Sequence, residues 1–198
     1  MTIAHTRNLL LALVFIPIAA VGALTACSGP DAQEARAALA PGSDLAPGSD
    51  LAPRGEVVSG VPVERVIDGD TIKVLLRGQD VTVRLIGIDT PETVKPGSPV
   101  DCFGPEASEF AQQMLDGQSV TLEFDAGQGA TDKYGRALAY VWLELPGGGL
   151  SLFNLDAVAG GYANERQYGA TPYAWRPEFA AAQESAQHGD LGMWSACA

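Results

Sequence analysis

Apolar and polar residues alternate through three consecutive segments of the chain. The segments are Val57–Ile67, Thr71–Leu76 and Val81–Ile88, and two short polar turns separate them, at Asp68-Gly69 and at Arg77-Gly78. Alternation with a period of two is typical of strands with one buried face, and Asp-Gly is a favoured hairpin turn. The pattern therefore predicts three antiparallel strands joined by two hairpins.

A helix is predicted after these strands. Pro105 suits the first turn of a helix, and Gly117 suits the position just past the last turn. Between them, apolar residues recur at the spacing of one helix face: Ala107, Phe110, Ala111, Met114 and Leu115.

Four further elements complete the pattern. Two more strands are predicted at Ser119–Phe124 and Arg136–Leu145, and two more helices at Leu152–Ala159 and Pro177–His188. The order βββ-α-ββ-α-α indicates an α+β fold. Five strands with an inserted helix fit a five-stranded OB-type β-barrel with three helices, a shape often used to bind oligonucleotides.

The N-terminus has the layout of an export signal. Arg7 precedes an apolar run from Leu9 to Ala26, and Cys27 follows that run directly. This end resembles a bacterial lipoprotein signal, which predicts a signal peptide at 1–26 and lipid on Cys27. An uncleaved transmembrane anchor is the alternative. Either reading places the rest of the chain outside the membrane, lipid-anchored to the outer face of the bacterial cell membrane or secreted.

The segment between the signal and the first strand has the composition of a tether. Residues 28–55 contain no aromatic residue, and Ala-Pro-Gly-Ser-Asp-Leu occurs twice, at 40–45 and 46–51. Such a segment cannot bury a core and is predicted to be a flexible linker. The folded domain is then 56–198.

The chain is strongly acidic, with 12 Lys and Arg against 24 Asp and Glu and a net charge of −12. Only three basic and four acidic residues precede Glu56, so the acidity belongs to the domain. Affinity for nucleic acids comes mostly from Lys and Arg that neutralise phosphates. A nucleic-acid function must therefore depend on a small local site.

Two polar motifs flank the second and third predicted strands. Asp68-Gly69-Asp70-Thr71 is either a hairpin turn or a pair of carboxylates that offers oxygen ligands to Ca²⁺ or Mg²⁺. Arg84 lies in an apolar strand, where a charge is costly unless it is paired, and a barrel-rim ion pair would satisfy it. Asp89 and Glu92 follow it and could simply cap a turn.

A third motif precedes the fifth predicted strand, Thr131-Asp132-Lys133-Tyr134-Gly135-Arg136. By itself it is a polar hairpin loop with a glycine in a left-handed position.

Together and in this order, the motifs resemble the staphylococcal nuclease family. They read Asp-Gly-Asp-Thr at 68–71, Arg-x4-Asp-Thr-Pro-Glu at 84–92, Gly-Pro-Glu-Ala at 104–107 and Asp-Lys-Tyr-Gly-Arg at 132–136. The resemblance runs from about Glu64 to Ala111, resumes over Asp132–Tyr140 and continues weakly to Trp194. It implies an OB barrel that binds one Ca²⁺ per domain.

The resemblance also implies roles for single residues. The carboxylates of Asp70 and Asp89 and the backbone carbonyl of Thr90 would hold the metal, with Asp68 in the outer shell of the site. Glu92 would act as general base on water, because a carboxylate can accept that proton.

Charge stabilisation would come from two arginines. Arg84 and Arg136 would clamp the phosphate, because planar guanidinium groups bind its oxygens in pairs and offset its charge. None of the motifs contains a histidine, so the motifs do not favour a histidine-based mechanism.

Substrate contacts are implied for the loop before the fifth strand and for a later tyrosine. Lys133 and Tyr134 match the first of these. A gapless register places Gln167 at the second, and we take Tyr168, one residue on, as the candidate. Tyr162 and Tyr173 remain alternatives. The segment Thr93–Asp101 has a single basic residue, Lys95, which is few for a substrate-binding loop.

Two cysteines remain if Cys27 carries lipid, an even pair in an oxidising compartment. Cys102 and Cys197 look like the disulfide of exported family members, and two buried free thiols are the alternative.

The function expected from this set is a monomeric, calcium-dependent endonuclease. It would hydrolyse DNA and RNA with little sequence preference and leave 3′-phosphate ends. A catalytically inactive nucleic-acid- or protein-binding module on the same fold is one alternative, and a calcium-binding envelope protein is another.

Overall fold

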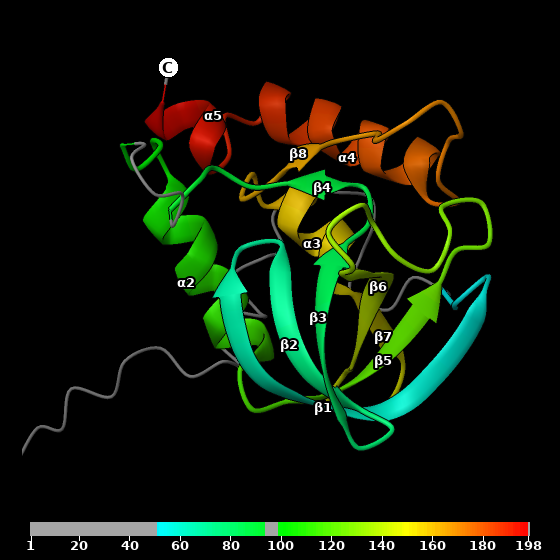
Figure 1. The fold of residues 1–198 in the computed structure, drawn as a ribbon. Coiled ribbons are helices and arrows are strands. Elements are labelled where there is room, and N and C mark those ends of the chain that lie inside the picture. Colours follow the sequence, from blue (N-terminus) through cyan, green and yellow to red (C-terminus); the bar gives the residue numbers. More distant parts are fainter. Residues whose placement is uncertain (1–50, 94–98, 198) are drawn as a thin grey trace, which may run out of the picture.

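The fold is a small barrel with helices at one end and along one side (Figure 1). The computed structural model describes residues 51–93 and 99–197. The signal peptide, Cys27 and the linker up to residue 50 lie outside the described residues, so these parts of the sequence analysis stay predictions.

Five strands close the barrel, in agreement with the predicted OB-type fold. They are β1 (Glu56–Asp68), β2 (Thr71–Leu76), β3 (Gln79–Leu85), β5 (Ser119–Phe124) and β6 (Ala137–Glu144). The long strand β1 pairs with both β2 and β5, and β6 pairs with β5. Parallel pairing of β3 with β6 completes the ring.

Three short strands accompany the barrel: β4 (Ile88–Asp89), β7 (Leu150–Leu152) and β8 (Asn164–Glu165). The helices are α2 (Gly104–Leu115), α3 (Phe153–Ala159), α4 (Arg176–His188) and α5 (Met193–Ala196). Three of the helices match the predicted ones to within a residue or two. The three short strands and α5 are not predicted, because two to four residues are too few to show a period.

The predicted strand Val81–Ile88 is wrong at its C-terminal end, because the chain turns at Gly87. Gly87 has φ of 80°, and a Cβ there would lie 2.7 Å from the ring of Tyr173. Only glycine fits both conditions. The turn ends β3 at Leu85 and sends Ile88 and Asp89 into a separate pairing with β8.

The core fills the barrel and extends under the helices. Its largest fully buried side chains include Trp142, Trp175, Tyr140, Phe153 and Phe179. The rings of Trp142 and Trp175 meet edge to face at 5.4 Å, which joins β6 to the segment that leads into α4. In Figure 1, α2 runs along one side of the barrel, whereas α4 and α5 lie with β4 and β8 at one end.

A buried carboxylate fastens the start of the domain to this core. Glu123 on β5 accepts hydrogen bonds from the indole N–H groups of Trp142 (2.7 Å) and Trp175 (3.2 Å). It also accepts the backbone N–H groups of Arg54 (2.6 Å) and Gly55 (2.8 Å). The contacts of the domain therefore begin before Glu56, in residues that the sequence pattern assigns to the linker.

In the part of the chain that the structure describes, no helix has the length and apolar character needed to cross a membrane.

Replacing Glu123 tests this anchoring role. We expect Glu123→Ala to lower the free energy of unfolding by at least about 3 kcal/mol, because N–H donors that lose a buried acceptor each cost about 1–3 kcal/mol. Glu123→Gln, which keeps one acceptor oxygen, should fall between this variant and the wild type. Urea unfolding followed by tryptophan fluorescence measures the effect. Glu109→Ala on the exposed face of α2 is the control, with a change of about 0.5 kcal/mol or less. Equal stabilities of the two alanine variants would contradict the role.

Candidate active site

The predicted functional residues line one pocket of about 750 Å³ at the helix-covered end of the barrel. The lining contains all ten: Asp68, Asp70, Arg84, Asp89, Thr90, Glu92, Lys133, Tyr134, Arg136 and Tyr168. They come from four stretches of chain, namely the β1–β2 turn, the stretch from β3 to just past β4, the loop before β6 and the segment after β8. The structure therefore brings the separate sequence motifs together.

A buried ion pair forms the floor of this pocket. Arg84 Nη2 lies 2.9 Å from Asp70 Oδ2, and each of the two residues is only 7% exposed. The pairing of β2 with β3 explains the contact, because Thr71 is the register partner of Arg84. Nη1 of the same guanidinium donates to the backbone carbonyls of Leu85 (2.8 Å) and Ile88 (2.9 Å). The charge of this arginine in an apolar strand is thus paired with a buried carboxylate.

Asp70 has an unusual electrostatic environment. Its burial raises its pKa to about 6, although the neighbouring Arg84 guanidinium opposes the shift, while Asp68 adds to it. Oδ1 accepts the hydroxyl of Thr71 at 2.9 Å and Oδ2 accepts the N–H of Thr90 at 3.1 Å. Negative charge is costly at this position, and a bound cation would relieve that cost.

Asp89 and Tyr168 extend the cluster. Asp89 Oδ1 lies 3.3 Å from Arg84 Nη2 and accepts the Tyr168 hydroxyl at 2.8 Å. Arg84 Nη2 in turn donates to the Tyr168 oxygen at 3.0 Å. Burial, helped by the hydrogen bond to Asp89, raises the pKa of Tyr168 to about 12, so that its hydroxyl stays a donor. One guanidinium therefore connects two carboxylates and a phenol.

The three candidate tyrosines for the second substrate contact differ in exposure and in their place relative to the pocket. Tyr162 stacks on Phe110 with ring centroids 4.1 Å apart and is not among the pocket residues. Tyr173 lines the pocket but is 3% exposed, and its hydroxyl donates to Glu165 at 2.9 Å. Tyr168 is 51% exposed and reaches the acidic cluster. Gln167, the residue in the gapless register, is not part of the pocket lining.

The loop before β6 is organised by Asp132. Its Oδ2 accepts Arg136 Nε at 2.7 Å, and its Oδ1 accepts the backbone N–H groups of Tyr134 and Arg136, both at 2.9 Å. Burial alone would raise the pKa of Asp132, but these hydrogen bonds and the guanidinium outweigh it and keep the pKa below its usual value. Asp132 therefore orients the Arg136 side chain through the Nε–H of its guanidinium group.

Tyr134 forms an open aromatic face beside this loop. It is 72% exposed, with Lys133 Nζ 4.9 Å and Arg136 Cζ 5.5 Å from its ring centroid. An exposed aromatic ring with cations beside it suits a nucleobase and its phosphate, because bases stack on aromatic rings and phosphates pair with cations.

Glu92 lies at the pocket wall in the segment that follows β4. Its Oε1 accepts the backbone N–H of Thr93 at 3.0 Å. Both of its main-chain polar groups bond to Asp101, at 3.0 Å from the Glu92 nitrogen and 2.9 Å to the Glu92 oxygen. The residues between Thr93 and Pro99 lie outside the described part of the chain.

Three residues of this region were not identified from the sequence. Asp101 and Asp132 hold Glu92 and Arg136, as described above. Arg166 lines the pocket, its backbone N–H donates to the Gly87 carbonyl at 2.9 Å, and its guanidinium lies 5.8 Å from the Tyr168 ring. The only signal for Arg166 in the sequence is its place two residues before Tyr168.

The donor set of the pocket fits a hard cation. Among the described residues no group of three or more His, Cys, Asp or Glu side chains is arranged to hold a metal ion. The oxygens of Asp70, Asp89 and Thr90 line the same pocket, and only oxygen donors are present in this set. Carboxylate and carbonyl oxygens suit Ca²⁺ and Mg²⁺, and the raised pKa of Asp70 shows a carboxylate that a cation would stabilise.

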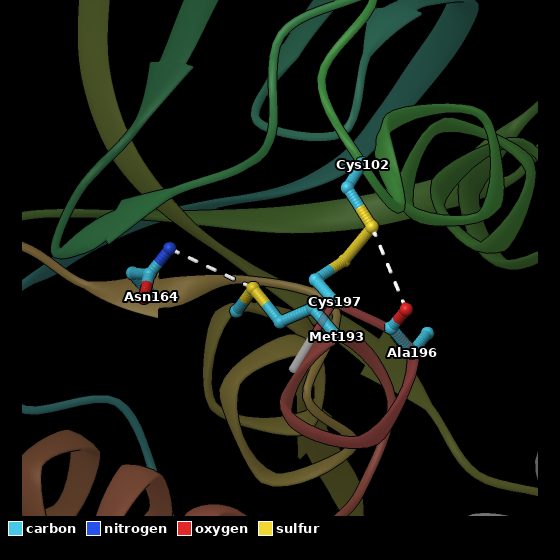
Figure 2. The surroundings of a disulfide bond; sticks show 5 residues. All are labelled: Cys102, Asn164, Met193, Ala196 and Cys197. Atoms are coloured by element: carbon cyan, nitrogen blue, oxygen red, sulfur yellow. Dashed lines mark hydrogen bonds between the residues drawn. A yellow bond between two sulfur atoms is a disulfide. The ribbon is translucent and has the colours of Figure 1, made fainter.

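The cysteine pair is joined. Cys102 and Cys197 form a disulfide that connects the start of α2 to the end of α5, so they are not two free thiols (Figure 2). In the same view the side-chain amide of Asn164 on β8 points to the sulfur of Met193 on α5, at 3.7 Å.

Comparisons with known proteins agree with this geometry. The family model described as Staphylococcal nuclease homologue matches residues 82–196. That match includes Arg84, Glu92 and Arg136. It begins after Asp70, whose place in the site comes from the ion pair with Arg84.

Several relatives are named as nucleases. The thermonuclease of Staphylococcus intermedius is 46% identical over 132 residues, which cover 67% of this chain and 74% of the relative. The thermonuclease of Staphylococcus hyicus is 44% identical over 133 residues, with the same two shares. Endonuclease YncB of Bacillus subtilis is 48% identical over 84 residues, 42% of this chain and 39% of the relative. With the family match, the closed barrel and the assembled pocket, these likenesses show that the chain belongs to the staphylococcal nuclease family.

Proposed function

We propose that this nuclease is a calcium-dependent endonuclease that hydrolyses DNA and RNA with little sequence preference and leaves 3′-phosphate ends. The observation that carries the proposal is the shared pocket of Arg84, Arg136, Asp70, Asp89 and Glu92. An inactive binding module would have no need to keep a base, two cationic groups and two carboxylates together.

Arg84 and Arg136 bind the phosphate in this proposal. Arg84 Nη2 lies where Asp70, Asp89 and Tyr168 meet, so a phosphate that contacts it is held next to both carboxylates. Arg136 approaches from the neighbouring loop, where Asp132 fixes its orientation. Two guanidinium groups offset charge that develops on the phosphate oxygens, which favours the transition state.

Glu92 takes the proton from the attacking water. Glu92 lines the same pocket as Arg84 and Arg136, and Asp101 holds its main chain. Ca²⁺, held by Asp70, Asp89 and the carbonyl of Thr90, would supply further positive charge to the phosphate.

The substrate strand lies across Tyr134 and Tyr168 in this proposal. Both rings are about half exposed or more at the pocket rim, and each has a cation near its face. Stacking on an aromatic ring does not depend on base identity, which accounts for the low sequence preference.

We also propose that the enzyme is exported and lipid-anchored through Cys27. The disulfide between Cys102 and Cys197 supports this location, because such bonds persist in oxidising compartments. A linker at 28–50 would then hold the domain clear of the membrane surface.

Removal of the metal and of the base tests the reaction. The full chain should nick plasmid DNA and degrade RNA with millimolar Ca²⁺ and lose this activity with a chelator. Glu92→Gln should lower kcat by about 100-fold or more, the usual contribution of a general base. Glu106→Gln, an exposed glutamate on α2, is the matched control and should cut like the wild type. Wild-type cleavage that is equal in chelator would exclude the metal, and full activity of Glu92→Gln would exclude the base.

The salt dependence of DNA binding tests how many phosphate contacts the pocket makes. With a net charge of −12 and few cations at the pocket, affinity for DNA should fall only shallowly with added salt. Arg166→Ala should reduce the slope of log affinity against log salt by about 0.9 for a duplex, the value of one lost phosphate contact. Binding to a labelled oligonucleotide in chelator gives the slope without cleavage. Arg65→Ala, exposed on β1 outside the pocket, should leave it unchanged, and equal slopes for both variants would remove Arg166 from the binding site.

A further inference from the structure

We propose that Asp101 is a positioning residue for Glu92, and that the Cys102–Cys197 disulfide holds Asp101 in place, so that hydrolysis depends on the disulfide. The inference rests on the proposed role of Glu92 as the base. It concerns residues outside the sequence motifs of the site.

Asp101 forms hydrogen bonds with both the backbone N–H and the backbone carbonyl of Glu92. The Glu92 N–H donates to Asp101 Oδ2 at 3.0 Å, and the Asp101 N–H donates to the Glu92 carbonyl at 2.9 Å. A single residue therefore holds both main-chain polar groups of Glu92, on either side of the Cα that carries the proposed base. A general base must lie within hydrogen-bond reach of its water, and displacement by about 1 Å can cost about 100-fold in rate.

The start of α2 packs against the carbonyl end of Glu92. The Gly104 N–H donates to the Asp101 carbonyl at 3.1 Å. A Cβ added at Gly104 would lie 3.0 Å from the Glu92 carbonyl oxygen and 2.9 Å from Thr93 Cγ2. A larger residue at 104 would therefore push against Thr93 and the Glu92 carbonyl. Asp101 and Gly104 thus form a seat for the base.

The disulfide ties this seat to the other side of the pocket. Cys102, the residue after Asp101, is bonded to Cys197 at the end of α5 (Figure 2). Met193 is the first residue of α5, and its sulfur accepts the side-chain N–H of Asn164. Its backbone N–H donates to the Gly161 carbonyl at 3.0 Å.

A closed ring of contacts results, because Asn164 on β8 is also the register partner of Asp89 on β4. The ring runs from Asp89 to Glu92, through Asp101 and the disulfide to α5, and back through β8. Asp101 and Cys102 are both exposed, so little packing holds them. The disulfide is then the strongest link in this ring. Its reduction removes the covalent restraint next to Asp101, so that Asp101 can move relative to Glu92.

Two variants at Asp101 separate positioning from general stability. Asp101→Ala should lower kcat by about 10- to 100-fold with KM almost unchanged, because phosphate binding by Arg84 and Arg136 is not altered. Asp101→Asn keeps an oxygen that can accept the Glu92 N–H and should recover most of kcat. Asp116→Ala, an exposed aspartate at the other end of α2, is the control and should match the wild type. Circular dichroism confirms that each full-length variant is folded.

The disulfide arm uses oxidised chain, chain reduced and then alkylated, and the double variant Cys102→Ala with Cys197→Ala. Reduction should lower kcat of the wild type by a similar factor, well below its melting temperature. It should add little to the loss in Asp101→Ala, since the two changes act through one path. Oxidised chain treated with the alkylating reagent alone is the control.

The possible outcomes are distinguishable. If the oxidised wild type does not cleave with Ca²⁺, the proposed function fails and takes this inference with it. If it cleaves and Asp101→Ala retains wild-type kcat, only the positioning role is overturned. If reduction lowers the melting temperature but leaves kcat unchanged, or if its effect on kcat multiplies fully with that of Asp101→Ala, the disulfide is a structural bond and the coupling is overturned.

Discussion

The buried ion pair between Arg84 and Asp70 is the interaction on which the rest of the site depends. Removal of Arg84 would leave the buried carboxylate of Asp70 without a cation beside it, and breaking a buried pair in this way is strongly destabilising. The same guanidinium bonds the carbonyls of Leu85 and Ile88, on both sides of the turn at Gly87. It therefore sets the direction in which the chain leaves β3 and brings Asp89 to the pocket. One side chain both shapes the backbone and presents a cation to an anionic substrate.

The distribution of charge gives this cation its importance. In an acidic protein, a polyanion is repelled by most of the surface and attracted only where cations gather. Arg84, Lys133, Arg136 and Arg166 all line one pocket, within a chain of net charge −12. With cations gathered only at the pocket, the proposed nuclease would hold a short stretch of nucleic acid through few phosphate contacts.

Sequence reasoning recovers the barrel because long strands and amphipathic helices leave a period in the pattern, as in Thr71–Leu76 and Gly104–Leu115. It recovers all of the predicted pocket residues except Tyr168 because they lie in three compact motifs, at 68–71, 84–92 and 132–136. It does not recover Asp101 or Arg166, since their partners, the Glu92 main chain and the Tyr168 ring, are set by tertiary contacts that no local pattern encodes. The two-residue strands at Asp89 and Asn164 are not predicted for the same reason, because their pairing is a tertiary contact.

One part of the site is held by the barrel sheet, and the other part is held by contacts from neighbouring segments. Asp70 and Arg84 lie in the sheet of the barrel, whose ladder bonds and apolar core hold them. Asp89 and Glu92 lie in a stretch with only a two-residue strand of its own, so their positions depend on β8, on Asp101 and on the disulfide. Segments with few contacts open most easily in native proteins. In the proposed mechanism, part of the charge stabilisation therefore comes from Arg84 in the barrel sheet, whereas proton transfer belongs to Glu92 in the less supported stretch. The accuracy of that stretch then depends on a covalent bond outside the pocket.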